Sequence, residues 1–424
     1  MASQKLAENG LAPAVHHLLQ EIEKSAELLH LFERAFREIP APFQETPDGF
    51  GHERIRHYRH LVQAIDRATK TAPVWMSMLR TDCVIGCPMN EALIWFMNTR
   101  TGAQILARDD INSHLGMILK EWGRFLSSPA SASVVHAQQG GWLSPEAREE
   151  MLQAVNAAHN AALQAPSFED AFVCDPSQPS WGFRSWDDFF TRRFRPQIRP
   201  VACPDDDGVI VMPCESQPLA LAAHVPEQQH FSLKETTYSF RGMLNNDPIA
   251  SSFAGGTVFQ GWLSLFDYHR WHAPVAGTVA KVAQIPGTYF AADASNGFES
   301  VDAAHMPCPD RQAPDKSQRL LTSIATRTVV ILGADDARLG LVGFIAVGMS
   351  DVSSCVAKVK VGDRVSKGQE MGSFHYGGSS YCVLFQPGVC LTFSPLLGAA
   401  LEGESSPEIQ GRCFAVNSEL ARVA

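Results

Sequence analysis

The first part of the chain carries apolar residues at the spacing of amphipathic helices. Leu18, Ile22, Leu29, Phe32 and Phe36 recur three, four or seven residues apart. Residues at these intervals lie on one face of an α-helix, so the pattern predicts helices whose apolar faces pack into a core. The helical pattern extends to about residue 170.

A second helix signal lies near the end of this region. Ser144 is a favourable N-cap residue, and Pro145 suits the first helical position because its missing N–H would have no partner there. The alanine-rich run from Met151 to Leu163 continues the helical pattern. The sequence therefore predicts a helix that begins at Pro145 and includes this run.

The pattern changes after the proline-rich segment 175–179. Segments 276–282 and 355–361 alternate or are rich in β-branched residues, which is typical of strands. Their order and turns resemble the hammerhead of biotinyl and lipoyl carriers, but no lysine lies in a Met-Lys-Met context at a hairpin tip. We therefore expect an α+β fold with a mainly helical domain, residues 1–175, followed by a mainly β domain, residues 176–424.

Composition narrows the class of protein. A chain of 424 residues exceeds a typical domain of about 100 to 200 residues, which agrees with two domains. The net charge of −10, with no basic run, argues against nucleic-acid binding and makes the surface a poor match for anionic lipid. The most apolar stretch, Leu339–Met349, is 11 residues long, whereas a membrane-spanning helix needs about 20. This stretch therefore predicts a buried strand.

The N-terminal residues and the cysteines indicate the cellular compartment of the protein. The first ten residues lack the basic and apolar regions of a secretion signal. The ten cysteines are scattered without Cys-x-x-Cys spacing, which favours free thiols in a reducing compartment over disulfides or a zinc site. We therefore expect a cytoplasmic protein without a metal centre and without stable insertion in a membrane. Its oligomeric state is not predicted.

The segment from Phe374 to Tyr381 contains a candidate site of self-cleavage. Gly377 and Gly378 can take backbone angles barred to other residues, which would let the Gly378 carbonyl approach the Ser379 hydroxyl. Attack there would convert the peptide bond to an ester, and elimination and hydrolysis would leave a pyruvoyl group made from Ser379. Alone, however, Gly-Gly-Ser-Ser is typical of a flexible turn.

The surroundings of this segment resemble the phosphatidylserine decarboxylase family. In that family a Lys-Gly-Gln-Glu-Met-Gly run leads into a Leu-Gly-Ser-Thr cleavage site, and here residues 367–372 lead into Gly377-Gly378-Ser379-Ser380 with one residue inserted. Further similar motifs occur in the family's order, at residues 185–200, 211–216, 266–274 and 286–290. The resemblance implies a pyruvoyl cofactor formed from Ser379, without PLP, and cleavage between Gly378 and Ser379.

The first part of the chain is similar to one branch of the family, the soluble fungal tryptophan decarboxylases. The similar segments are residues 58–61, 95–102, 122–128 and 141–143, and in the second part residues 244–248 and 268–274. The resemblance implies decarboxylation of a small-molecule amino acid, with L-tryptophan or a related aromatic amino acid as the expected substrate.

Two histidines are candidates for the proton transfers. The family pattern gives His272 the role of the base that takes the Ser379 proton, and places His269 near the pyruvoyl group during decarboxylation. A His-x-x-His pair can also bind a metal or be stacked in a core. The surrounding aromatic residues and Pro274 predict an extended segment, in which residues three apart face opposite sides, and this argues against a shared metal.

An acidic residue is expected to orient the base through its other ring nitrogen, as in serine-hydrolase triads. Asp207 precedes a glycine, as the family aspartate does, but it lies in the acidic turn 205–208, which is typical of a solvated loop. The spacing from residues 211–213 instead puts Glu215 at the aspartate position. We therefore expect Glu215 to orient the histidine.

Three functions remain open at this point. The first is pyruvoyl-dependent decarboxylation of an L-amino acid. The second is phosphatidylserine decarboxylation, which uses the same chemistry on a lipid headgroup to make phosphatidylethanolamine. The third is a non-catalytic carrier or binding module built on the lipoyl-like strands.

Overall fold

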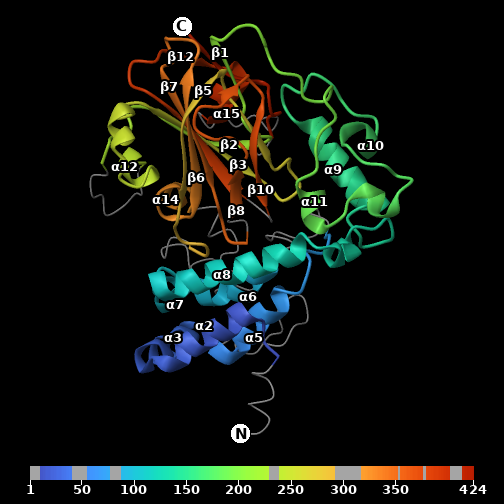
Figure 1. The fold of residues 1–424 in the computed structure, drawn as a ribbon, viewed down its shortest axis with the longest axis vertical. Helices are drawn as coiled ribbons and strands as arrows, with labels where there is room; N and C mark the ends of the chain where they lie inside the picture. The colour runs from blue at the N-terminus through green and yellow to red at the C-terminus, as the bar shows by residue number, and fades with distance from the viewer. Residues whose placement is uncertain are drawn as a thin grey trace.

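The computed structural model describes residues 10–40, 55–76, 87–228, 238–291, 317–351, 354–375, 379–401 and 413–424. The helices of residues 13–126 form a layer at one end of the molecule, the strands lie above it, and the helices of residues 145–190 lie beside the strands (Figure 1). The fold is therefore α+β, as the sequence predicts. None of the described helices combines the length and apolar character needed to cross a membrane.

The described helices that precede the first strand begin mostly at prolines or after capping residues. Their bounds are α2 (Pro13–Lys24), α3 (Ala26–Glu38), α5 (Tyr58–Ala68), α6 (Pro88–Met97), α7 (Arg100–Leu106), α8 (Asp109–Leu126), the 3-10 helix η2 (Pro129–Val134), α9 (Pro145–Ala157), α10 (Phe168–Ala171), η3 (Pro179–Gly182) and α11 (Trp186–Phe190).

Several predicted features of this region are confirmed. Leu18, Ile22, Phe32 and Phe36 are buried in α2 and α3, and Ser144 caps α9 by accepting a hydrogen bond from the Ala147 amide. The predicted continuation of this helix to residue 163 is wrong, because α9 ends at residue 157 and residue 159 pairs with residue 414 of the second part.

The second part is built from antiparallel sheets. The largest has the order β2-β3-β11-β7-β6-β5-β9, and two smaller sheets have the orders β4-β10-β8 and β1-β13-β12. The bounds are β1 (Val209–Val211), β2 (Gln217–Ala222), β3 (Thr257–Leu263), β4 (Arg270–His272), β5 (Gly277–Ile285), β6 (Arg327–Ala334), β7 (Leu341–Val347), β8 (Ser354–Ala357), β9 (Arg364–Val365), β10 (Glu370–His375), β11 (Ser379–Phe385), β12 (Leu391–Phe393) and β13 (Glu419–Val423).

Short helices accompany these strands. They are α12 (Phe240–Met243), η4 (Pro248–Ser252), α14 (Gln318–Ile324) and α15 (Pro395–Leu401). The predicted strands at 276–282 and 339–349 correspond to β5 and β7, whereas the one at 355–361 is shorter than expected and ends at residue 357.

The large sheet packs differently on its two faces. On one face, Phe344 of β7 stacks on Trp271 of β4 with 5.0 Å between ring centroids, and on Tyr381 of β11 with 5.8 Å. The sheet β4-β10-β8 therefore covers this face. Val329 and Cys382 belong to a second apolar cluster on the other face, together with residues of α12 and α14.

The helical layer is joined to the strand-rich part by buried and partly buried hydrogen bonds. Asp351, which follows β7, accepts hydrogen bonds from the amides of Met89 and Asn90 at the start of α6, at 3.0 and 2.8 Å. Asn112 of α8 donates to the Gly287 carbonyl at 2.5 Å. One continuous apolar cluster includes residues of both parts. The domain boundary at 175/176 stays a prediction.

Candidate active site

The candidate site lies where the chain passes twice between two sheets. After β3 in the large sheet, residues 264–269 lead to β4 in the smaller sheet, and residues 376–378 connect β10 of the smaller sheet to β11 of the large one. Because β3 pairs with β11 and β4 pairs with β10, the two connections begin and end beside each other. We call residues 264–269 the crossing segment.

Ser379 is the first residue of β11 and lies opposite Leu263, the last residue of β3. Its side chain is fully buried, and its Oγ has no hydrogen-bond partner among the described residues. Side chains alternate along a strand, so Ser379 shares a face with Tyr381, which packs toward the sheet that holds β4 and β10. Gly377 and Gly378, which precede the bond predicted to be cleaved, lie outside the described residues.

His269 ends the crossing segment. Its carbonyl accepts a hydrogen bond from the Phe374 amide at 2.8 Å, and its ring stacks on Phe190 of α11 with 4.0 Å between centroids. The residue is fully buried, and in the described part of the chain neither ring nitrogen has a hydrogen-bond partner. Burial lowers the pKa of His269 well below its ordinary value, and Arg192 acts in the same direction. The imidazole is therefore neutral near pH 7.

His272 lies three residues further along β4, opposite Glu370. Its Nδ1 is 2.7 Å from the Gly368 carbonyl oxygen, so this nitrogen carries the hydrogen and donates it, while Nε2 is 3.2 Å from the Tyr268 hydroxyl. The pKa of His272 is lowered, because the effect of burial outweighs the opposite effect of the hydrogen bond to the Gly368 carbonyl. This arrangement leaves Nε2 as the basic nitrogen and links it to the crossing segment through Tyr268.

The two histidines have separate surroundings, as an extended segment predicts. Trp271 between them packs on the large sheet, so its neighbours Arg270 and His272 point to the other side of β4. The register places His269 beside the strand end that leads to Ser379, and His272 about 10 Å further along at about 3.3 Å per residue. Its position thus makes His269 the nearer neighbour of Ser379. Its greater base strength and its fixed tautomer, however, favour His272 as the base that takes the Ser379 proton.

Glu215 makes contacts other than the expected one with His272. Both of its carboxylate oxygens accept from the Arg199 guanidinium, with 2.9 Å between Arg199 Nε and Glu215 Oε2, and Oε2 also accepts from the Val416 amide at 2.8 Å. The His272 imidazole is hydrogen-bonded to the Gly368 carbonyl and not to Glu215, because the buried Arg199 guanidinium already pairs with the Glu215 carboxylate. Glu215 still raises the pKa of His272 through space. Asp207 is exposed in the turn before β1.

A further carboxyl group, which the sequence analysis did not single out, lies in the crossing segment. Asp267 is buried, and its Oδ2 accepts from the Ser264 amide at 2.6 Å. Burial raises the pKa of Asp267 to about 7, and the nearby Glu215 carboxylate acts in the same direction. The signal for Asp267 was its position two residues before His269 in the motif at 266–274.

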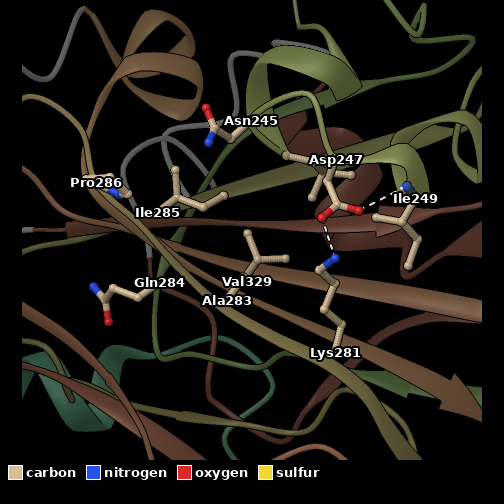
Figure 2. Close-up of a pocket in the computed structure, with 10 residues that line it drawn as sticks. Asn245, Asp247, Ile249, Lys281, Ala283, Gln284, Ile285, Pro286 and Val329 are labelled. Atoms are coloured by element: carbon tan, nitrogen blue, oxygen red, sulfur yellow. Dashed lines mark hydrogen bonds and ion pairs between the residues drawn. The ribbon is translucent and has the colours of Figure 1, made fainter.

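A hollow of about 190 Å³ lies elsewhere on the second part of the chain (Figure 2). It is bordered by Val329 of β6 and by residues of β5, and the ion pair of Lys281 with Asp247 lies on one side. Val329 faces the second apolar cluster, whereas Tyr381 and Ser379 face the other side of the large sheet. This hollow is therefore separate from the candidate active site.

Comparisons with known proteins identify the family of this chain. Family models for phosphatidylserine decarboxylase match residues 12–151 and 186–399. The chain is 39% identical to the decarboxylase iboD of Amanita muscaria over 342 residues, which cover 80% of this chain and 91% of the relative. It is 34% identical to the L-tryptophan decarboxylase of Psilocybe cubensis over 355 residues, 81% of this chain and 76% of the relative.

More distant similarity extends to lipid enzymes. Phosphatidylserine decarboxylase proenzyme 3 of Schizosaccharomyces pombe is 28% identical over 222 residues, which cover 52% of this chain and 21% of the relative. The matched regions include the crossing segment, both candidate histidines and Ser379. The chain therefore belongs to the phosphatidylserine decarboxylase family and is a carboxy-lyase.

Proposed function

We propose that the chain cleaves itself between Gly378 and Ser379 and then decarboxylates an L-amino acid with the pyruvoyl group that forms from Ser379. The observation that carries this proposal is the buried Ser379 hydroxyl, which has no hydrogen-bond partner among the described residues and begins a strand directly after the Gly-Gly pair. A buried hydroxyl without a partner is costly, and such groups are often retained for chemistry. This hydroxyl therefore fits the nucleophile of the self-cleavage step.

The surrounding residues would handle protons during cleavage. His272, with its tautomer fixed by Gly368 and its Nε2 facing the Tyr268 hydroxyl, is the proposed base for Ser379. His269, buried beside the strand end, is proposed to serve the substrate after cleavage. When formed, the pyruvoyl group supplies a carbonyl that withdraws electrons as carbon dioxide leaves. The buried crossing segment excludes water from this step.

The substrate proposed is L-tryptophan or a related aromatic amino acid. Support comes from the similarity to the fungal L-tryptophan decarboxylases along both the helical and the strand-rich parts. The phosphatidylserine decarboxylase proenzymes match only about half of this chain, for example 52% in the fission yeast relative. We extend the proposal to a cytoplasmic enzyme with a domain boundary near residue 175, as the sequence predicts.

Two measurements on the purified full chain test this proposal. A denaturing gel with mass spectrometry should show fragments 1–378 and 379–424, with the short one blocked by a pyruvoyl group. The cleaved protein should then release tryptamine from L-tryptophan. Production of phosphatidylethanolamine from phosphatidylserine vesicles, without tryptamine, would replace the substrate proposal with the lipid one. An intact chain without a keto-reactive fragment would contradict the pyruvoyl mechanism itself.

A further inference from the structure

A third histidine precedes the proposed cleavage site by a few residues in the sequence and is paired with a carboxylate. His375 is the last residue of β10, four positions before Ser379. Its Nδ1 lies 2.7 Å from Oδ1 of Asp187 in α11, and its Nε2 lies 3.3 Å from the Ser373 hydroxyl. Both members of the pair are mostly buried, with side-chain exposures of 22% and 14%. The pair thus lies within the protein.

The same short helix supports two of the histidines. Asp187 in the first turn of α11 contacts His375, and Phe190 at its end stacks on His269. The rings of His375 and His269 are close enough for His375 to lower the pKa of His269. Because His269 joins the end of β10 through Phe374, helix α11 holds both imidazoles beside the strand end that precedes Ser379.

Self-cleavage requires an acid as well as a base. When Ser379 Oγ bonds to the Gly378 carbonyl carbon, the carbon–nitrogen bond to Ser379 must break, and the departing nitrogen must gain a proton. His269 and His272 both have lowered pKa values, so each enters the reaction as a neutral imidazole and suits the role of base. Among the described residues, neither His269 nor His272 is hydrogen-bonded to a carboxylate, whereas His375 is paired with the Asp187 carboxylate.

We propose that His375, positioned by Asp187, donates the proton to the Ser379 amide nitrogen during self-cleavage. The Ser379 hydroxyl proton passes to the neutral base, the oxygen bonds to the Gly378 carbon, and the bond from that carbon to nitrogen breaks. The nitrogen takes a proton from the His375 imidazolium, which becomes neutral. An imidazolium has two donors, so one can stay on Asp187 while the other serves the reaction. This inference rests on the proposed function.

The alternative is that the pair only ties α11 to β10. Substitutions at one position separate the two roles: His375→Gln removes both the charge and the proton, whereas His375→Arg keeps a cation for Asp187 but cannot lose a proton at neutral pH. Asp187→Asn removes the positioning carboxylate. Asp188→Asn, on the same helix but bonded to Arg184, is the matched control.

The full-length variants are synthesised in a cell-free system, and the cut fraction is followed on denaturing gels, with and without hydroxylamine, which splits esters but not amides. We expect His375→Gln and His375→Arg to be cut roughly 10² to 10⁴ times more slowly than the parent, with no ester for hydroxylamine to split. Asp187→Asn should be slowed less, and Asp188→Asn should match the parent.

Each other outcome has a definite meaning. Parent-like cutting of His375→Arg would show that an ion pair is sufficient and would overturn the inference. Ester accumulation in His375→Gln would place His375 after the acyl transfer and would also overturn it. If the parent itself remains uncut, the proposed function fails, and this inference fails with it. Circular dichroism and thermal unfolding of each variant show whether slow cutting comes from a folded chain.

Discussion

The Phe374 amide donates a hydrogen bond to the His269 carbonyl across 2.8 Å, and this bond joins the end of the crossing segment to the strand that precedes Ser379. On the other side of the site, Ser379 pairs with Leu263, the residue just before the crossing segment. The site is therefore held by backbone pairing on both sides. Substitutions of its side chains should consequently alter chemistry more than fold.

Ser379→Ala should abolish cleavage, because it removes the hydroxyl that attacks the Gly378 carbonyl. The matched control is Ser380→Ala, since Ser380 is also buried but lies on the opposite face of β11, near Gln260. Mass spectrometry should find an intact chain for the first variant and a pyruvoyl-blocked fragment for the second. A Ser379→Ala chain cut at the same bond would refute the nucleophile assignment.

The two histidines should separate cleavage from turnover. We expect His272→Ala to leave the precursor mostly uncut, because Nε2 of His272 is the proposed base. His269→Ala should still mature, at least in part, but should form amine roughly 10² to 10⁴ times more slowly per cleaved chain, because it loses acid–base help. The reverse pattern, an uncut His269→Ala and a processed His272→Ala, would give His269 the base role that its position beside β10 favours.

Glu215→Ala should destabilise the protein by about 3–5 kcal/mol, because it leaves the buried Arg199 charge without its partner. Asp207→Ala should change stability by less than about 0.5 kcal/mol, because Asp207 is exposed. Urea unfolding in the Ser379→Ala background measures both without interference from cleavage. Cutting should also be slower in folded Glu215→Ala than in Asp207→Ala. If Asp207→Ala stops cutting while Glu215→Ala matures normally, the alignment of Glu215 with the family aspartate is wrong.

Asp351 should make stability depend on pH. Burial raises its pKa to about 7, against the effect of its two backbone donors, whereas an unfolded aspartate titrates near 3.9. Between these values the folded state binds more protons than the unfolded state, so this group makes stability fall as pH rises from about 4 to about 7. Asp267, with its pKa also raised to about 7, acts in the same direction.

Asp351→Asn cannot titrate and should therefore lose less stability over this pH range than its parent. Urea unfolding at pH 5 and pH 7, again in the Ser379→Ala background, measures the difference. Equal losses in the two proteins would show that Asp351 does not titrate in this range.

The sequence predicted the elements whose patterns are local. Ser144 begins α9 as a capping residue should, and the apolar run at 339–349 forms β7 because strands buried on both sides need little polar surface. The end of α9 at residue 157 was not predictable from propensity, because residue 159 is held by pairing with distant residue 414. Tertiary pairing overrides an alanine-rich pattern there.

The site was predictable as a set of residues but not as a set of contacts. The motifs indicated Ser379, His269, His272 and Glu215, and the structure describes all of them. The partner of Glu215 is Arg199, and the partner of His272 Nδ1 is a backbone carbonyl. A carbonyl has no side-chain signature in sequence, and the pairing of a buried carboxylate depends on which cation the fold places beside it.

The position of β11 has a consequence for the mature enzyme. This strand lies between β3 and β7, and β13 near the C-terminus pairs with β1. A cut before Ser379 would therefore leave the short fragment as an interior strand of a sheet formed by the long one, held by two ladders of hydrogen bonds. The fragments should behave as one cooperative unit that separates only in denaturant. Each short fragment would remain with the long chain from which it was cut, so exchange between molecules would require unfolding.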